Sequence, residues 1–165
     1  MLNAGFTEAL LALLAILLVV AAVIDVRTFT ISNGLNAAVA LLAPLYWWSI
    51  GLPLWPDAAI QVAVAAGVFA LLAITFYIGM MGGGDVKLAA AIALWFRPET
   101  TLKFLVIMSL AGGVLTLIVL LLHKKRANPP RDQDGRPEKP EVPYGVAIAA
   151  GALWILAQRF LNQFA

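Results

Sequence analysis

The sequence predicts an all-α, polytopic membrane protein of about six transmembrane helices. Of its 165 residues, 62% are hydrophobic and only 12% are charged, and the mean hydropathy is +0.93. A soluble domain of this length would need far more charge to cover its surface. The apolar residues fall into long runs divided by short polar turns, and a membrane-spanning helix needs about 20 of them. We therefore expect residues 1–165 to form a single membrane-embedded domain.

The predicted helices follow these apolar runs in order. They cover residues 5–24, 35–50, 57–78, a short run at 88–96, 102–122 and 143–158. Ser32 or Asn33 is expected to cap the second helix. Trp47, Trp48 and Trp55 cluster near the turn that follows it, as an interfacial aromatic belt would. Residues 123–142 contain four prolines and many charges, and they are expected to form a hydrophilic loop.

The basic residues predict the orientation, because cytoplasmic loops of membrane proteins are enriched in Lys and Arg. If the spans alternate, the first, third and fifth connections lie on one side and hold 8 of the 11 basic residues. These eight are Arg27, Lys87, Lys124, Lys125, Arg126, Arg131, Arg136 and Lys139. That side is expected to face the cytoplasm, with both termini outside. Asp25 and Asp85 fall on this same face, although only basic residues were used to assign it.

Composition excludes several kinds of site. The chain has no cysteine and a single histidine, His123, which excludes disulfides, thiolate metal sites and histidine-rich metal sites. We therefore expect neither a metal nor another cofactor. The net charge of +2 is too small to indicate a nucleic-acid partner.

Two of the nine acidic residues, Asp25 and Asp85, stand at the predicted membrane boundary between apolar helices. An acid costs roughly 2.5–3.5 kcal/mol at a helix centre on insertion scales, so an acid near the membrane indicates function. Two simpler interpretations stay open. Asp85 follows three glycines and precedes an apolar run, which suits an N-cap, and Asp25 could be the solvated end of a helix.

The glycines before Asp85 favour a functional site. Gly82 and Gly84 carry no side chain, and irregular backbone at membrane depth is tolerated only where it is buried or lines a watered cavity. Two carboxylates in such a cavity can hydrolyse a peptide: the ionised one takes a proton from water, and the protonated one hydrogen-bonds the scissile carbonyl. Asp85 opens a predicted helix and Asp25 closes one, so the helix dipoles favour Asp85 as the base and Asp25 as the acid.

The segments around both aspartates resemble those of a known family. Gly82-Gly83-Gly84-Asp85-Val86-Lys87 resembles the GxGDxK motif of the type IV prepilin peptidases and archaeal preflagellin peptidases, which are membrane aspartic proteases. Asp25-Val26-Arg27, followed by Ile31-Ser32-Asn33, resembles the first motif of that family, with Ser32 in place of the usual proline. Pro143-Tyr144-Gly145-Val146-Ala147-Ile148 resembles the stretch that opens the last helix of the family.

The resemblance implies an aspartic endopeptidase that cleaves the leader peptide of pilin-like precursors at the cytoplasmic face of a bacterial or archaeal membrane. Asp25 and Asp85 carry over as its catalytic pair. Without cysteine or a long cytoplasmic segment, the chain resembles the short, peptidase-only branch associated with tight-adherence (Flp-type) pili. The candidates for supporting the site or binding substrate are Gly82, Gly84, Lys87, Arg27 and Asn33. For the last three, a charged anchor at the membrane surface or a helix cap is the alternative role.

Two rival functions stay open. A small membrane carrier of protons or cations also uses intramembrane acids, but it predicts polar residues spread through the membrane depth. A non-catalytic pilus-assembly subunit would use the aspartates only as caps. Substituting Asn distinguishes this last case, because Asn caps a helix as well as Asp but does no acid–base chemistry. The sequence indicates no oligomeric state.

Overall fold

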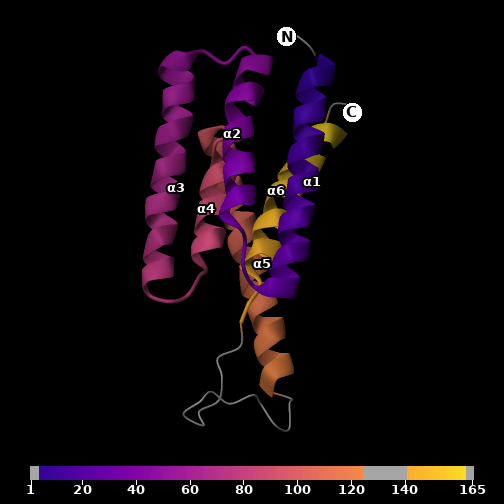
Figure 1. The fold of residues 1–165 in the computed structure, drawn as a ribbon, viewed down its shortest axis with the longest axis vertical. Coiled ribbons are helices and arrows are strands. Elements are labelled where there is room, and N and C mark those ends of the chain that lie inside the picture. Colours follow the sequence, from indigo (N-terminus) through magenta and orange to yellow (C-terminus); the bar gives the residue numbers. More distant parts are fainter. Residues whose placement is uncertain (1–3, 125–140, 163–165) are drawn as a thin grey trace.

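The computed structural model describes residues 4–124 and 141–162, and all regular structure in these ranges is helical (Figure 1). The elements are α1 (Ala4–Thr28), α2 (Asn33–Ser49), η1 (Leu54–Ala58), α3 (Ala59–Tyr77), α4 (Gly83–Ala93), α5 (Pro98–Lys124) and α6 (Tyr144–Leu161). The short element η1 is a π-helical turn that leads into α3. The all-α prediction is confirmed for the described residues.

The helix boundaries differ most from the predicted ones at the start of α4, which begins at Gly83 and not at residue 88, and by four residues at the start of α5 and the end of α1. The predicted helix ended at residue 24, whereas α1 continues to Thr28, and the Asp25 carbonyl accepts a hydrogen bond from the Phe29 N–H at 2.8 Å. Asp25 therefore lies inside α1, and its side chain is buried against the start of α6 and not in water. The predicted cap of α2 is confirmed for Ser32, whose hydroxyl accepts a hydrogen bond from the Leu35 N–H at 3.3 Å.

The short helix α4 is the innermost element. It packs against α2, α3 and α6, and much of it has no exposed surface. Two indole groups fix this region to α2: Trp47 donates to the Leu94 carbonyl at 2.8 Å, and Trp95 donates to the Val39 carbonyl at 2.9 Å. Leu94 follows the last residue of α4, where helical carbonyls lack partners within the helix. These bonds therefore hold a short helix firmly inside the bundle.

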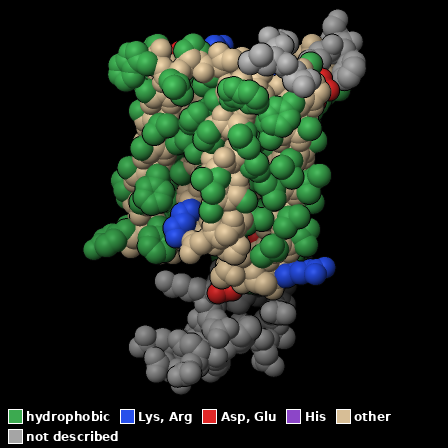
Figure 2. Space-filling model, turned by 45° about the horizontal axis from the view of Figure 1, so that its top comes forward, with side chains coloured by type: hydrophobic (Ala, Val, Ile, Leu, Met, Phe, Trp, Pro, Cys, Tyr) green, Lys and Arg blue, Asp and Glu red, His purple; other side chains and the backbone are tan. Residues whose placement is uncertain are grey.

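Four helical segments are long and apolar enough to cross a membrane: Ala4–Thr28, Leu54–Tyr77, Pro98–Leu122 and Tyr144–Leu161. The helices α2 and α4 are shorter, with 17 and 11 residues. Figure 2 shows hydrophobic side chains over most of the visible face, with the few charged side chains near its two ends. Such a surface suits contact with lipid. The chain is a membrane protein, and the count of about six spans stays a prediction.

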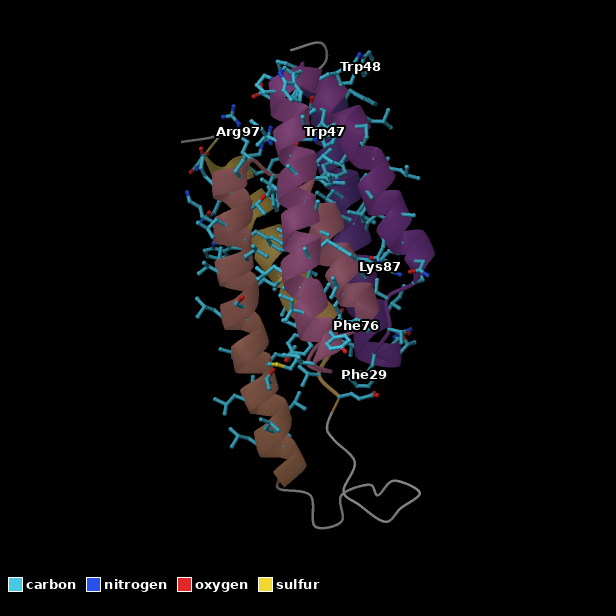
Figure 3. All side chains as sticks on the ribbon, turned by 90° about the vertical axis from the view of Figure 1, so that its left-hand side faces the viewer. Phe29, Trp47, Trp48, Phe76, Lys87 and Arg97 are labelled. Atoms are coloured by element: carbon cyan, nitrogen blue, oxygen red, sulfur yellow. The ribbon has the colours of Figure 1, made fainter. Side chains whose placement is uncertain are left out.

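The bundle has two distinct ends. One end, called here the aspartate end, holds the α1–α2 and α3–α4 connections and the start of α6. Figure 3 shows Phe29, Phe76 and Lys87 toward this end, and Trp47, Trp48 and Arg97 toward the opposite end. Most of the predicted hydrophilic loop, residues 125–140, lies outside the described residues.

Candidate active site

Asp25 lies near the end of α1 and faces the start of α6. It is only 2% exposed. Its Oδ2 accepts a hydrogen bond from the Gly145 N–H at 2.6 Å, and the Val146 backbone amide also hydrogen-bonds its carboxyl group. N–H groups in the first turn of a helix have no partner within that helix, and the helix dipole is positive there. The start of α6 is therefore a binding site for the Asp25 carboxylate.

Gly145 is required for this contact, because a side chain would take the place of the carboxylate. A Cβ atom at Gly145 would lie 2.8 Å from Asp25 Oδ2 and 2.8 Å from Cδ1 of Ile31. Both distances are shorter than non-bonded carbon contacts allow. Only glycine fits here without displacing Asp25 or Ile31.

Asp85 lies in the first turn of α4, three residues after the N-cap residue Gly82. The Gly82 backbone amide hydrogen-bonds the Asp85 carboxyl group, as in a capping box. Asp85 is therefore not the N-cap itself, which was one of the simpler interpretations of the sequence. Its Oδ1 is buried and has no hydrogen-bond partner among the described residues. A buried carboxylate oxygen costs free energy unless it is bonded, so this oxygen can accept from, or when protonated donate to, a bound molecule.

The two carboxyl groups interact electrostatically. Asp85 lies outside the four candidate spans, and burial raises its pKa to about 7. The charge of Asp25 is the second cause of this higher pKa, and the hydrogen bond from Gly82 opposes both. Below about pH 7, Asp85 therefore retains a proton.

Ile31 contacts glycines that lie beside both aspartates. It lies in the connection between α1 and α2 and is 7% exposed. A Cβ atom at Gly84 would lie 2.6 Å from the Ile31 carbonyl oxygen, and the Ile31 side chain also meets Gly145. Gly84 precedes Asp85, and Gly145 bonds Asp25. The two glycines thus let α4 and α6 close on Ile31, which brings both aspartates to the same end of the bundle.

Two polar contacts hold α2 against α4 beside the aspartates. Asn36 is buried, and its Nδ2 donates to the Gly84 carbonyl at 2.9 Å. Lys87 Nζ donates to Asn33 Oδ1 at 2.8 Å on the exposed side of the same pair of helices. Asn33 and Lys87, both predicted as supporting residues, are therefore brought together, although neither bonds an aspartate in the described part of the chain.

The other predicted residues differ in how they contribute. Gly82 is the N-cap of α4, and a Cβ atom there would lie 2.8 Å from Asp85 Oδ2. Arg27 is exposed in the last turn of α1, and its side chain has no hydrogen bond or ion pair with any described residue. No group of three His, Cys, Asp or Glu side chains that could hold a metal ion occurs within residues 4–124 and 141–162.

Sequence reasoning missed three residues of this site: Gly145, Ile31 and Asn36. The segment around Gly145 was noticed, but its contact with Asp25 joins positions 120 residues apart, which no local pattern indicates. Asn36 carried a usable signal, since an amide in an otherwise apolar helix must find a partner. Ile31 belongs to the segment Ile31-Ser32-Asn33 of the family resemblance, but nothing local indicated its contacts with Gly84 and Gly145.

The fold and the site together define a helical membrane protein with two buried, interacting aspartates, an arrangement that can support hydrolysis by an aspartic mechanism. The chain belongs to the type IV leader peptidase family, whose model matches residues 12–117 and so includes both aspartates. This membership implies a protease that acts on pilin-like precursor proteins. No curated protein and no solved structure matches the chain.

Proposed function

We propose that the chain is an aspartic endopeptidase that removes the leader peptide of pilin-like precursors, with Asp25 and Asp85 activating the attacking water. The observation that carries this proposal is the burial of two electrostatically interacting aspartates, from α1 and α4, at one end of the bundle, one bonded to the start of α6 and the other with an unpaired oxygen. Helix caps alone would not require both carboxyl groups to be buried at one end of the bundle.

The contacts support a division of roles opposite to the one that the sequence favours. Asp25 closes its own helix and is buried, which disfavours a carboxylate, but the hydrogen bonds that it accepts from the start of α6 offset part of this cost. Asp85 has one backbone bond and an oxygen without a partner, and its pKa of about 7 favours the acid form. We therefore assign Asp25 as the base and Asp85 as the acid. This proposal differs from the sequence-based one because the latter considered only the helix that contains each residue.

In this mechanism the Asp25 carboxylate takes a proton from water as the water oxygen attacks the scissile carbonyl carbon. Protonated Asp85 donates a hydrogen bond to the carbonyl oxygen and then its proton, which gives a neutral tetrahedral intermediate. When the C–N bond breaks, the leaving amine takes a proton from Asp25, and Asp85 recovers its proton from the intermediate. Asp25 ends as the carboxylate and Asp85 as the acid, as they began, so the cycle consumes only water and the peptide.

Reaching the pair requires a local opening. Asp25 and Asp85 are 2% and 7% exposed, and Ile31 is packed between Gly84 and Gly145. We propose that the segment between α1 and α2 moves when the precursor binds. Phe29 in this segment has a positive φ of 51°, which is unfavourable for a residue with a side chain. The local conformation of Phe29 therefore favours this segment less than helical geometry favours the two helices that it joins.

We further propose that the aspartate end faces the cytoplasm in a multi-pass arrangement of about six spans, and that the substrate belongs to the Flp type of pilin. The basic residues Arg27 and Lys87 lie at this end and are exposed, as the distribution of basic residues in the sequence requires. The lack of cysteine supports the peptidase-only branch.

The apolar side chains in the described core argue against a carrier of protons or cations. Such a carrier needs polar groups along a path through the membrane. Between the aspartates and the opposite end, α1 presents Leu14, Leu18 and Ala21 to the core with no exposed surface, and α4 does the same with Leu88 and Ile92. These five core side chains offer no polar group to a proton or a cation.

Co-expression with a candidate precursor tests the proposed function. Wild type should remove the leader, which a gel shift detects, whereas Asp25→Asn and Asp85→Asn should accumulate in the membrane and leave the precursor intact. Asn preserves hydrogen-bond acceptance but not acid–base chemistry. Leader removal by both variants would show that neither aspartate is needed for cleavage and would overturn the proposed mechanism.

A further inference from the structure

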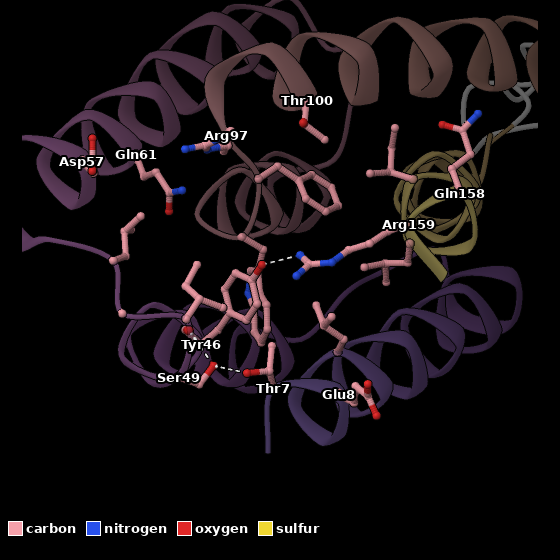
Figure 4. A pocket seen from close by; sticks show the side chains of 18 of the residues that line it. Thr7, Glu8, Tyr46, Ser49, Asp57, Gln61, Arg97, Thr100, Gln158 and Arg159 are labelled. Atoms are coloured by element: carbon pink, nitrogen blue, oxygen red, sulfur yellow. Dashed lines mark hydrogen bonds between the residues drawn. The ribbon is translucent and has the colours of Figure 1, made fainter. Parts of the chain in front are cut away.

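The end of the bundle opposite the aspartates encloses a second polar site. A cavity of about 770 Å³ lies there, lined by the start of α1 and the ends of α2 and α6 (Figure 4). Glu8 lines this cavity, and 17 residues of α1 separate it from Asp25, which is about 25 Å at 1.5 Å per residue. Leu14 and Leu18 fill part of the space between them. The cavity is therefore separate from the candidate active site.

Three basic side chains line this cavity without a carboxylate partner. Arg97, Lys103 and Arg159 contribute to it, and none of them forms an ion pair with another described residue. The Arg159 guanidinium donates to the Tyr46 hydroxyl and lies over the Tyr46 ring, 5.7 Å from its centroid (Figure 4). A guanidinium has five N–H donors, so Arg159 is fixed in place while other donors stay available for an anion.

The same cavity contains acceptors that suit a cationic group. Gln61 is only 4% exposed, and its Oε1 is buried with no hydrogen-bond partner in the described part of the chain. Figure 4 shows Gln61 directed into the cavity, with Asp57 nearby on the same segment. A buried acceptor without a donor costs free energy, so a ligand that donates a hydrogen bond to Gln61 is favoured.

The position of the cavity corresponds to the level of lipid headgroups. Trp48, near the end of α2, and Trp55, in η1 beside the cavity residues Pro53 and Asp57, are 64% and 82% exposed, and exposed tryptophans typically mark the headgroup level. Leu54, beside Trp55, is 84% exposed. A phospholipid can therefore place its headgroup in the cavity while its acyl chains lie along the apolar surface of the bundle.

We infer that this cavity binds a phospholipid headgroup of the phosphoethanolamine type. Arg97 and Arg159 bind the phosphate, because the planar guanidinium matches phosphate oxygens in pairs. Gln61 and Asp57 bind the ammonium group, whose three N–H donors satisfy the unpaired Gln61 oxygen. Bound lipid links η1, α3, the α4–α5 connection and α6 at this end and so stabilises the folded bundle. This inference does not depend on the proposed protease activity.

Thermal unfolding of the purified full chain tests the inference. The protein is kept in detergent micelles that contain increasing dioleoyl phosphatidylethanolamine, and parallel series use phosphatidylcholine, phosphatidylglycerol or water-soluble phosphoethanolamine. Phosphatidylethanolamine should raise the unfolding temperature most, because phosphatidylcholine has no N–H donors and phosphatidylglycerol has no cation. Gln61→Leu and Arg97→Gln should each weaken the binding of phosphatidylethanolamine by about fivefold to tenfold, which is the effect expected from the loss of one hydrogen bond.

Arg27→Gln is the matched control, since it removes an exposed cation at the aspartate end, and it should leave the lipid response unchanged. Arg97→Gln alters an exposed side chain and so carries the test if Gln61→Leu does not fold. Equal stabilisation by all three lipids, or an undiminished response in both cavity variants, would overturn the inference. Equal stabilisation by soluble phosphoethanolamine would assign the cavity to a soluble ligand and would also overturn it.

Discussion

At the scale of single residues, backbone groups and glycines prepare the candidate site. The contacts that fix Asp25 and Asp85 come from the N–H groups of Gly145, Val146 and Gly82. Backbone N–H groups at a helix start are held by the helix itself, so they hold a carboxylate in a defined place at little conformational cost. The glycines matter because they allow each carboxyl group to approach the backbone closely.

Gly145→Ala should reduce precursor cleavage by about 100-fold, because a displacement of about 1 Å of a catalytic group has an effect of this size. The added methyl group would displace Asp25 or Ile31. The measurement is the initial rate of leader removal by equal amounts of membrane-inserted protein. Gly113→Ala is the matched control, since its Cβ atom meets nothing within 4 Å, and it should cleave at the wild-type rate. Normal cleavage by Gly145→Ala would disprove the role given to the α6 start.

The proton on Asp85 predicts a pH dependence. Its raised pKa means that the acid form persists up to about pH 7 and is lost above it. Because the acid form donates to the scissile carbonyl in the proposed mechanism, the cleavage rate should fall about tenfold per pH unit at higher pH. A pH–rate profile of the purified protein, with unfolding monitored in parallel, checks this. A rate that keeps rising to pH 9, with the protein still folded, would contradict the assignment of Asp85 as the acid.

At the scale of elements, the packing of α4 shows what the sequence could and could not predict. The glycines and apolar run of α4, and the aspartate at its start, were evident from the sequence, because these are local features. That α4 is innermost, and that Trp47 and Trp95 fix this region to α2, depends on contacts between distant segments. The partner of Asp25 was missed for the same reason, since α6 lies far along the chain.

The three glycines before Asp85 should respond differently to alanine. A Cβ atom at Gly84 would lie 2.6 Å from the Ile31 carbonyl oxygen, which is backbone and cannot move aside without moving the segment. At Gly83 it would lie 3.3 Å from the ring of Phe76, which is exposed and can move. Gly84→Ala should therefore lose about 1–3 kcal/mol of stability, and Gly83→Ala much less. Thermal unfolding of both purified variants measures this, and equal losses would contradict the proposed packing of α4.

At the scale of the whole molecule, the bundle separates two polar ends by an apolar middle. The sequence predicted the membrane class correctly because long apolar runs allow few other folds. It predicted about six spans, and four segments in the described structure are long enough by themselves. Length alone does not decide the role of α2 and α4, because short helices inside a bundle are covered by their neighbours.

The orientation can be tested directly, because the chain has no cysteine. Trp55→Cys places a thiol at the end opposite the aspartates, and Glu141→Cys places one just before α6, at the aspartate end. A maleimide that cannot cross membranes should label Trp55→Cys in intact cells and label Glu141→Cys only after permeabilisation. The reverse pattern would place the aspartate end outside the cytoplasm.

The central claim is that Asp25 and Asp85 act together as one catalytic unit, and a double-mutant comparison tests it most directly. Initial rates of leader removal from a purified precursor are measured for wild type, Asp25→Asn, Asp85→Asn and the double variant, each confirmed to be folded. The effects of substituting residues that act as a unit are not additive. The cleavage rate of each single variant should therefore be at least about 1,000-fold below that of wild type, and the rate of the double variant should be no lower. Substantial cleavage by either single variant, or losses that multiply in the double variant, would contradict the account.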